Sequence, residues 1–231
     1  MDEGMKSKIR IWARKNFVGI ALLSIVLFAA AGRLNWTMAW VYTGVNFLLM
    51  LSNLIVLTRK NPEVLASRAD VTQDDSKDWD KIFTTLYGPT LLVMMAVIGL
   101  DAGRYLWSSV SPIAVNISLA IFVIGWGISL WAMVANKFFE TSVRIQEDRS
   151  QETISSGPYA LVRHPGYAGL ILYYVATPIL LGSWWGTIPA LILSLGFVLR
   201  TMREDQTLLE ELPSYQNYAN KVRFRLIPWI W

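Results

Sequence analysis

The chain contains a single histidine, His164, where a charged loop meets an apolar stretch. Pro165 follows it, and proline suits the first position of a helix because its missing N–H would have no partner there. The free N–H groups and the positive dipole end of a helix start favour an anion. With Arg163 adjacent and Tyr159 and Tyr167 flanking, this junction predicts a positive mouth walled by aromatic rings, suited to a small zwitterion that carries a carboxylate.

The same residues also fit a purely structural interpretation. Arginine extends its charged end to the membrane interface, and tyrosine is enriched in the aromatic belt, so the pentapeptide from Arg163 to Tyr167 could simply cap a membrane helix. The residues alone leave both interpretations open, and the surrounding elements must decide.

Composition indicates a membrane protein. Of 231 residues, 54% are hydrophobic and only 16% are charged, which is far from the balance of a soluble domain. We expect an all-α bundle of about six transmembrane helices in a single domain, with four spans in residues 1–136 and a catalytic core in residues 137–231. The last two spans should form a tight hairpin that turns at residues 182–186. Six apolar runs are long enough to span, or nearly so: Phe17 to Ala31, Trp36 to Leu57, Ile82 to Leu100, Pro112 to Ala135, Gly166 to Leu181 and Trp184 to Leu199.

The basic residues indicate an orientation. They fall almost entirely in alternate connections, and only Arg33 and Arg104 are left for the other side. Both termini and the His164 junction are therefore expected on the cytoplasmic side. The formal charge of +4 then indicates contact with membrane lipids, and no nucleic acid partner is expected. The first run could instead be a signal peptide, but its removal would leave an odd number of spans against the charge pattern.

Cysteine is absent, so disulfides and thiolate catalysis are excluded, and one histidine makes a transition-metal site improbable. The connection from Thr58 to Lys81 is rich in aspartate and could be mistaken for a hard-cation site. We interpret it as a solvated, charge-balanced loop, expect no metal, and infer that the chemistry comes from an organic cofactor. The aspartates are Asp70, Asp74, Asp75, Asp78 and Asp80.

A second candidate pair follows the sixth apolar run. Arg200 and Glu204 lie four residues apart, on one helical face at the membrane boundary, where ionisable groups are costly. They could form an ion pair with each other or contact a ligand. The helix should continue to Leu212, and a short helix that carries Tyr215 and Tyr218 should follow as a cover over a cytoplasmic pocket.

Taken together, four motifs resemble the isoprenylcysteine carboxyl methyltransferase family, to which phospholipid methyltransferases are related. The resemblance extends from Gln146 to the C-terminus. It implies an integral membrane enzyme that binds S-adenosylmethionine, without a Rossmann domain, in a cytoplasmic pocket open to the bilayer. The motifs are Ser156-Gly157-Pro158-Tyr159, Arg163-His164-Pro165-Gly166-Tyr167, Arg200-Thr201-Met202-Arg203-Glu204-Asp205 and Tyr215-Gln216-Asn217-Tyr218.

The resemblance also implies roles for single residues. Arg200 matches an arginine on the methyl-acceptor side, and Asp205 stands at the second of two acidic positions that reach the cofactor. The residues implied to contact the cofactor are Gln146, Gln151, Glu152, Thr153, Ile154, Tyr159, His164, Pro165, Gly166, Tyr167 and Glu204.

Physical chemistry supports these roles. The helix start with His164 suits the methionine carboxylate, and Glu204 suits the cofactor's ammonium group or ribose hydroxyls. Attack of a carboxylate on a sulfonium destroys two charges, so a poorly hydrated site favours it and no general base is needed. We therefore expect methyl transfer to a lipophilic acceptor that enters from the bilayer, most simply a carboxylate of isoprenylcysteine type.

Other functions stay open. A phospholipid amine or a thiol could be the acceptor, although a proton would then have to leave, with His164 or a tyrosinate as base. A membrane reductase of sterol-reductase type would bind NADPH and use Arg200, Arg203, Arg223 and Arg225 for the 2'-phosphate. A transporter is less favoured, because the charges gather at one edge and no repeat is present.

Overall fold

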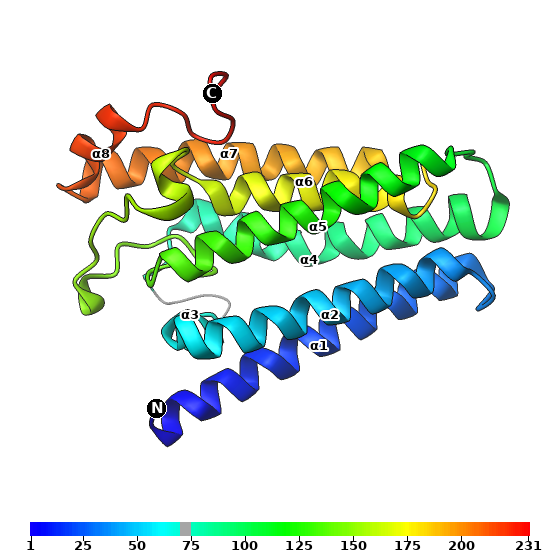
Figure 1. Ribbon diagram of the computed structural model, residues 1–231, viewed down its shortest axis with the longest axis horizontal. Coiled ribbons are helices and arrows are strands. Elements are labelled where there is room, and N and C mark those ends of the chain that lie inside the picture. Colours follow the sequence, from blue (N-terminus) through cyan, green and yellow to red (C-terminus); the bar gives the residue numbers. More distant parts are fainter. Residues whose placement is uncertain (70–74) are drawn as a thin grey trace.

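The computed structural model describes residues 1–69 and 75–231, and these residues contain helices and no strand, as expected (Figure 1). Asp70 and Asp74 of the acidic connection lie outside the described residues. The elements are α1 (Glu3–Ala31), α2 (Thr37–Lys60), α3 (Pro62–Ser67), α4 (Asp78–Ile98), the π-helical η1 (Gly99–Tyr105), α5 (Pro112–Ala135), the 3-10 turns η2 (Glu147–Arg149) and η3 (Gly157–Ala160), α6 (Pro165–Leu180), α7 (Thr187–Glu211) and α8 (Tyr215–Lys221).

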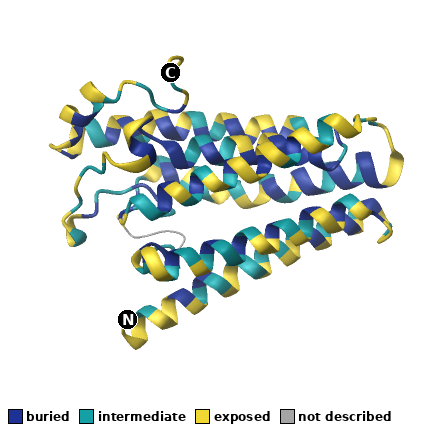
Figure 2. Cartoon of the chain, viewed as in Figure 1, coloured by how far each residue is buried: buried dark blue, intermediate teal, exposed yellow. Residues whose placement is uncertain are grey.

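Helices α4 to α7 run side by side, and the pair α1 and α2 packs along one side of them (Figure 1). Both termini lie at the same end of the bundle, together with α3 and α8 (Figure 1). We call this the pocket end. Buried residues follow the inward faces of the helices, whereas the outward faces are exposed along their length (Figure 2).

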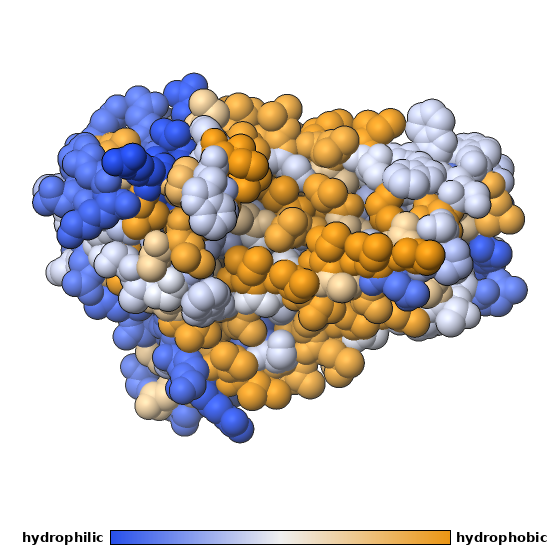
Figure 3. Space-filling view, turned by 45° about the horizontal axis from the view of Figure 1, so that its top comes forward, coloured by the Kyte–Doolittle hydropathy of each residue, from blue (hydrophilic) through white to orange (hydrophobic). Residues whose placement is uncertain are grey.

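The outward faces are apolar, which identifies an integral membrane protein. An apolar belt lies between two polar ends (Figure 3). Within the described residues, four helices are long and apolar enough to cross a membrane: Glu3–Ala31, Thr37–Lys60, Asp78–Tyr105 and Pro112–Ala135.

The expected fifth and sixth spans are α6 and α7. With 16 residues, α6 is about 24 Å long, less than the ~30 Å of a hydrocarbon core. The first half of α7 presents exposed apolar side chains such as Ile188, Ile192 and Leu195, and its second half is charged. The number of six spans and the cytoplasmic side of the termini stay predictions.

Small residues position the start of α6 against the end of α5. A Cβ on Gly125 would lie 2.6 Å from the carbonyl oxygen of Gly169, and one on Gly169 would lie 2.4 Å from that of Gly125. The Ser129 hydroxyl donates to the Gly166 carbonyl at 2.8 Å. Such residues let two helices approach closely. Pro165 is the first residue of α6, as the sequence predicted.

The predicted hairpin between α6 and α7 is confirmed, and its turn is held at the end opposite the pocket end. There the buried carboxylate of Asp101 accepts hydrogen bonds from the hydroxyls of Ser108 and Ser183, both at 2.6 Å. Helix α7 then runs back and continues past its apolar half to Glu211, before the short α8. This arrangement brings the charged half of α7 beside the start of α6.

Candidate active site

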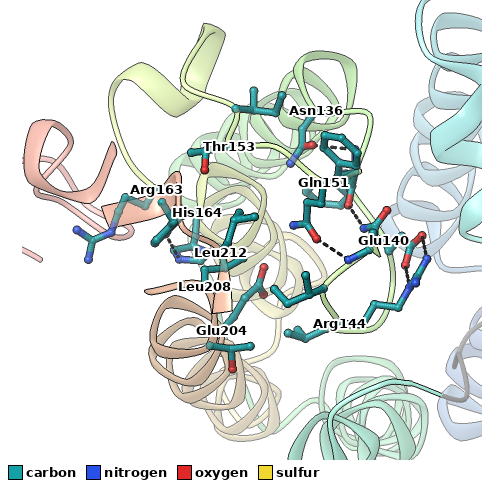
Figure 4. A pocket seen from close by; sticks show the side chains of 18 of the residues that line it. Asn136, Glu140, Arg144, Gln151, Thr153, Arg163, His164, Glu204, Leu208 and Leu212 are labelled. Carbon is teal, nitrogen blue, oxygen red and sulfur yellow. Dashed lines mark hydrogen bonds and ion pairs between the residues drawn. The ribbon is translucent and has the colours of Figure 1, made fainter. Parts of the chain in front are cut away.

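A pocket lies at the pocket end, between the loop that joins α5 to α6, the start of α6, the charged half of α7, and α8 (Figure 4). Its lining includes ten of the eleven residues expected to contact the cofactor: Gln146, Gln151, Glu152, Thr153, Ile154, Tyr159, His164, Gly166, Tyr167 and Glu204. Pro165 and Arg200 are not among the lining residues. The fold thus brings together positions 58 residues apart along the chain, from Gln146 to Glu204.

The loop wall is shaped by amide side chains. The buried Gln146 donates from Nε2 to the Phe138 carbonyl at 2.7 Å and accepts from Arg149 at 2.8 Å. Its backbone N–H donates to Oε1 of Gln151 at 2.8 Å. Both ends of the Gln146 amide are therefore used to fold the loop, and Gln151 closes the same turn.

The far side of the loop is fixed by contacts to other elements. Glu152 forms an ion pair with Lys137 at 3.2 Å, and the hydroxyls of Thr153 and Ser214 lie 2.6 Å apart. The buried Tyr159 hydroxyl accepts from Asn136 at 3.2 Å, and burial raises the pKa of Tyr159 above its ordinary value. Tyr159 is therefore a neutral wall residue at physiological pH.

The prediction of a positively charged pocket entrance at Arg163 is wrong, because Asp205 compensates the charge of Arg163. Its guanidinium donates to both carboxylate oxygens of Asp205, at 2.8 and 2.7 Å, and it points away from the cavity (Figure 4). Arg225 donates to the same carboxylate at 2.8 Å, as does the Tyr215 hydroxyl. Asp205 thus holds the C-terminal segment onto α7 and does not line the pocket.

Asp205 stays ionised in this network. Burial alone would raise the pKa of Asp205, but hydrogen bonding and charge from His164, together with hydrogen bonds from Tyr215 and Arg225, hold it below the ordinary range. His164 Nε2 lies 3.3 Å from Oδ1 of Asp205 and 3.4 Å from the Tyr215 hydroxyl. The imidazole also stacks on Tyr167, with ring centroids 5.9 Å apart and an interplanar angle of 4°.

Glycine at the start of α6 is required by a neighbouring ring. A Cβ on Gly166 would lie 2.5 Å from Cε2 of Phe139, a residue that lines the pocket. The first turn of a helix also leaves backbone N–H groups without intrahelical partners. The N–H groups of Gly166 and Tyr167 therefore give this wall of the pocket the donors and the positive dipole end that an anion requires.

Glu204 carries negative charge into the pocket. Its carboxylate points into the cavity and accepts from the Tyr167 hydroxyl at 2.5 Å (Figure 4). Within residues 1–69 and 75–231, no lysine, arginine or histidine forms an ion pair with it, whereas the pocket carboxylate of Glu140 is paired with Arg144 at 2.8 Å. A partly buried carboxylate with no cationic partner, facing helix N–H groups, fits a ligand that carries both an ammonium and a carboxylate.

Arg200 pairs with a residue that the sequence did not single out. Its Nε lies 2.8 Å from Oδ1 of Asp80, and its Nη2 donates to Oδ2 at 3.0 Å. The expectation that Asp80 belongs to a solvated loop is wrong, because this carboxylate is fully buried at the start of α4. The alternative of an ion pair between Arg200 and Glu204 is wrong as well.

Asp80 also touches the pocket wall. Its Oδ2 accepts from the Val143 backbone N–H at 2.7 Å, and Val143 lines the pocket. A sequence signal exists: Asp80 stands 11, 14 and 18 residues before the buried Leu91, Met94 and Ile98, spacings that place all four on one helical face. The Asp80 carboxylate therefore lies on the same buried face of α4 as these three apolar side chains.

The fold and the pocket define a helical membrane protein with a pocket lined by polar and apolar side chains at the pocket end. Residues 113–213, a little under half of the chain, match the phospholipid methyltransferase family. The chain is 28% identical over 109 residues to a rice (Oryza sativa subsp. indica) protein named "probable protein-S-isoprenylcysteine O-methyltransferase", covering 46% of this chain and 57% of that protein. It is 30% identical over 142 residues to a Pseudomonas methanethiol S-methyltransferase, covering 57% and 54%.

These matches confirm the resemblance drawn from the motifs. The matched part of the chain is similar to methyltransferases of the phospholipid, isoprenylcysteine and methanethiol types. It spans a little over half the length of the curated relatives that it matches.

Proposed function

We propose that this protein transfers a methyl group from S-adenosylmethionine to a lipophilic acceptor at the cytoplasmic face of a membrane. The observation that carries the proposal is the carboxylate of Glu204, which points into the pocket without a cationic partner among the described residues. The common location of both termini, where most basic residues of the sequence also lie, supports the cytoplasmic side.

In this proposal, the two charged ends of the cofactor's amino acid meet opposite charges in the protein. Glu204 binds the ammonium group, and the N–H groups at the start of α6 bind the carboxylate. His164 supports this wall from behind through its stack on Tyr167 and its contact to Asp205. When bound, S-adenosylmethionine supplies an electrophilic methyl group on a sulfonium.

The acceptor that we favour is a carboxylate of isoprenylcysteine type. Such an acceptor arrives ionised and needs no base, and a site with little water favours the loss of two opposite charges. The pocket supports this choice. His164 Nε2 is turned toward Asp205 and Tyr215, and the Tyr167 hydroxyl donates to Glu204. The Tyr167 hydroxyl is therefore engaged as a donor, and a carboxylate acceptor requires no base from the protein.

The reductase alternative is weakened by the ion pairs of its candidate arginines. Arg200 is bound to Asp80 and Arg225 is bound to Asp205, so two of the four expected phosphate ligands have carboxylate partners. A free cluster of guanidinium groups would be needed to favour a 2'-phosphate.

The test is methyl transfer by the purified full chain. We would incubate it with methyl-labelled S-adenosylmethionine and, separately, an S-prenylated cysteine, a long-chain thiol and phosphatidylethanolamine. We expect base-labile label, as released from a methyl ester, on the prenylated cysteine. Label on the thiol or the amine would contradict the carboxylate acceptor, and label on none of the three, nor on host lipids, would contradict the proposed activity.

A further inference from the structure

One arginine at the pocket end, Arg68, forms no ion pair with a carboxylate of residues 1–69 or 75–231. Arg68 follows α3, and its Nη1 donates to the Glu140 backbone carbonyl at 3.2 Å. Its guanidinium lies over the ring of Phe139, 5.2 Å from the centroid. Its Nε is buried and has no hydrogen-bond partner among the described residues. The Nε–H donor of this half-buried guanidinium is therefore unsatisfied by the described residues.

No described carboxylate compensates this charge by an ion pair. Glu140, whose backbone Arg68 contacts, directs its side chain to Arg144 at 2.8 Å and Arg149 at 3.6 Å. A half-buried cation that has no counterion among the described residues is costly, and in membrane proteins such a group typically marks a functional site. The cost is removed when an anion binds.

The charges around Arg68 belong to one cluster. Burial lowers the pKa of Arg68, and the like charge of Arg200 lowers it further, whereas Tyr87, Tyr167 and the carboxylate of Glu140 raise it. Arginine nevertheless stays protonated in proteins. Asp80 is paired with Arg200, so it does not form an ion pair with Arg68.

This cluster adjoins the pocket through one aromatic ring. The ring of Phe139 contacts the start of α6, where a Cβ on Gly166 would lie 2.5 Å from it, and it also carries the Arg68 guanidinium over its face. Phe139 lines the pocket and Arg68 does not, so the contact between Arg68 and the proposed cofactor site runs through the ring of Phe139.

We propose that Arg68 binds the carboxylate of the lipophilic acceptor, an inference that rests on the proposed function. The planar guanidinium fork matches a carboxylate in geometry and charge. Arg200, which the family resemblance assigned to the acceptor side, is already neutralised by Asp80, and Arg68 supplies the attraction instead.

The assignment also explains product release. A carboxylate oxygen forms a bond to the methyl carbon, the carbon–sulfur bond breaks, and its electron pair stays on sulfur. The acceptor becomes a neutral ester, the donor becomes a neutral thioether, and no proton moves. The attraction between Arg68 and the acceptor is lost in the same step. Arg68 lies outside residues 113–213, the part of the chain that matches the family.

The test compares two probes that differ in one group. N-acetyl-S-farnesylcysteine carries the carboxylate, and its primary carboxamide has the same shape without the charge. Dissociation constants for both are measured on the full chain in detergent, for the wild type, Arg68→Gln and Arg68→Lys. Arg59→Gln is the matched control, because Arg59 is exposed at the same end of the bundle. Binding of S-adenosylhomocysteine is measured on every variant.

We expect Arg68→Gln to weaken the carboxylate probe at least about tenfold, because hydrogen bonds to charged groups contribute about 1.5–3 kcal/mol. Affinity for the carboxamide and for S-adenosylhomocysteine should not change. Arg68→Lys keeps the charge and should lose less, and Arg59→Gln should lose nothing.

Three results would overturn the assignment: no carboxylate preference in the wild type, equal losses for both probes in Arg68→Gln, or no loss for either. If Arg68→Gln fails to bind S-adenosylhomocysteine, Arg68→Lys is used in its place. The quantity compared is then the carboxylate preference, which is the ratio of the dissociation constants of the carboxamide and the carboxylate. A preference in Arg68→Lys equal to that of the wild type overturns the assignment. A wild type that does not bind S-adenosylhomocysteine would contradict the proposed function itself.

Discussion

The buried pair of Asp80 and Arg200 should be strongly coupled in stability. The two side chains are 0% and 7% exposed, and they meet at 2.8 Å and 3.0 Å. Asp80 also accepts from the Val143 N–H at 2.7 Å. Asp80→Asn preserves an acceptor for that N–H and removes the charge, so it isolates the ion pair from the backbone contact. Arg200→Met removes the partner with little change in volume.

The expected magnitude follows from burial. Removing one member of a buried pair typically costs about 3–5 kcal/mol because the other charge is left without compensation. Replacing both removes that penalty. We therefore expect each single variant to lower the free energy of unfolding by about 3 kcal/mol. The double variant should lose at least about 1.5 kcal/mol less than the sum of the two.

The assay is reversible unfolding in mixed micelles, followed by tryptophan fluorescence as sodium dodecyl sulfate increases. The control pair is Lys77 and Glu211, which meet at a similar 2.7 Å but are 30% and 42% exposed. Exposed pairs contribute about 0–1 kcal/mol, so its coupling should be small. Additivity within about 0.5 kcal/mol for Asp80 and Arg200 would refute the reasoning.

Three further predictions concern the glycines of α6 and the buried network. Gly166→Ala should weaken S-adenosylhomocysteine binding several-fold by calorimetry, because its Cβ would displace the ring of Phe139; unchanged affinity would argue against that contact. Gly169→Ala should lower the thermal unfolding midpoint because its Cβ would meet a carbonyl oxygen of α5 at 2.4 Å, whereas Gly127→Ala, with nothing within 4 Å, should not; equal midpoints would refute the close packing. Because the pKa of Asp205 is lowered by folding, its contribution to stability is present above the ordinary carboxyl pKa of about 4 and is lost as pH falls below it. Unfolding free energies between pH 6 and 3 should therefore fall more steeply for the wild type than for Asp205→Asn, and parallel curves would contradict the lowered pKa.

Local signals in the sequence predicted much of this molecule. Pro165 marked the start of α6, and the short turn at residues 182–186 marked the hairpin, because both features depend on neighbouring residues alone. The ordered motifs also predicted which residues would gather around the pocket. Helix periodicity and capping are local, so these expectations needed no knowledge of packing.

The partners of the charged residues could not be predicted in the same way. Asp80 and Arg200 are 120 residues apart, and Arg163 and Asp205 are 42 apart. Which charge neutralises which depends on how α4, α7 and the C-terminal segment pack. The expected positive mouth at Arg163 was wrong for this reason. The lack of an ion-pair partner for Arg68 among the described residues likewise could be seen only in the structure.

The most direct test of the account is the affinity of S-adenosylhomocysteine for the wild type and for Glu204→Gln, with Glu210→Gln as the control on the exposed face of the same helix. We predict that Glu204→Gln binds about 10- to 100-fold more weakly while Glu210→Gln binds as the wild type does, and that NADPH does not bind. Equal affinities of Glu204→Gln and the wild type would contradict the claim that this carboxylate holds the methyl donor.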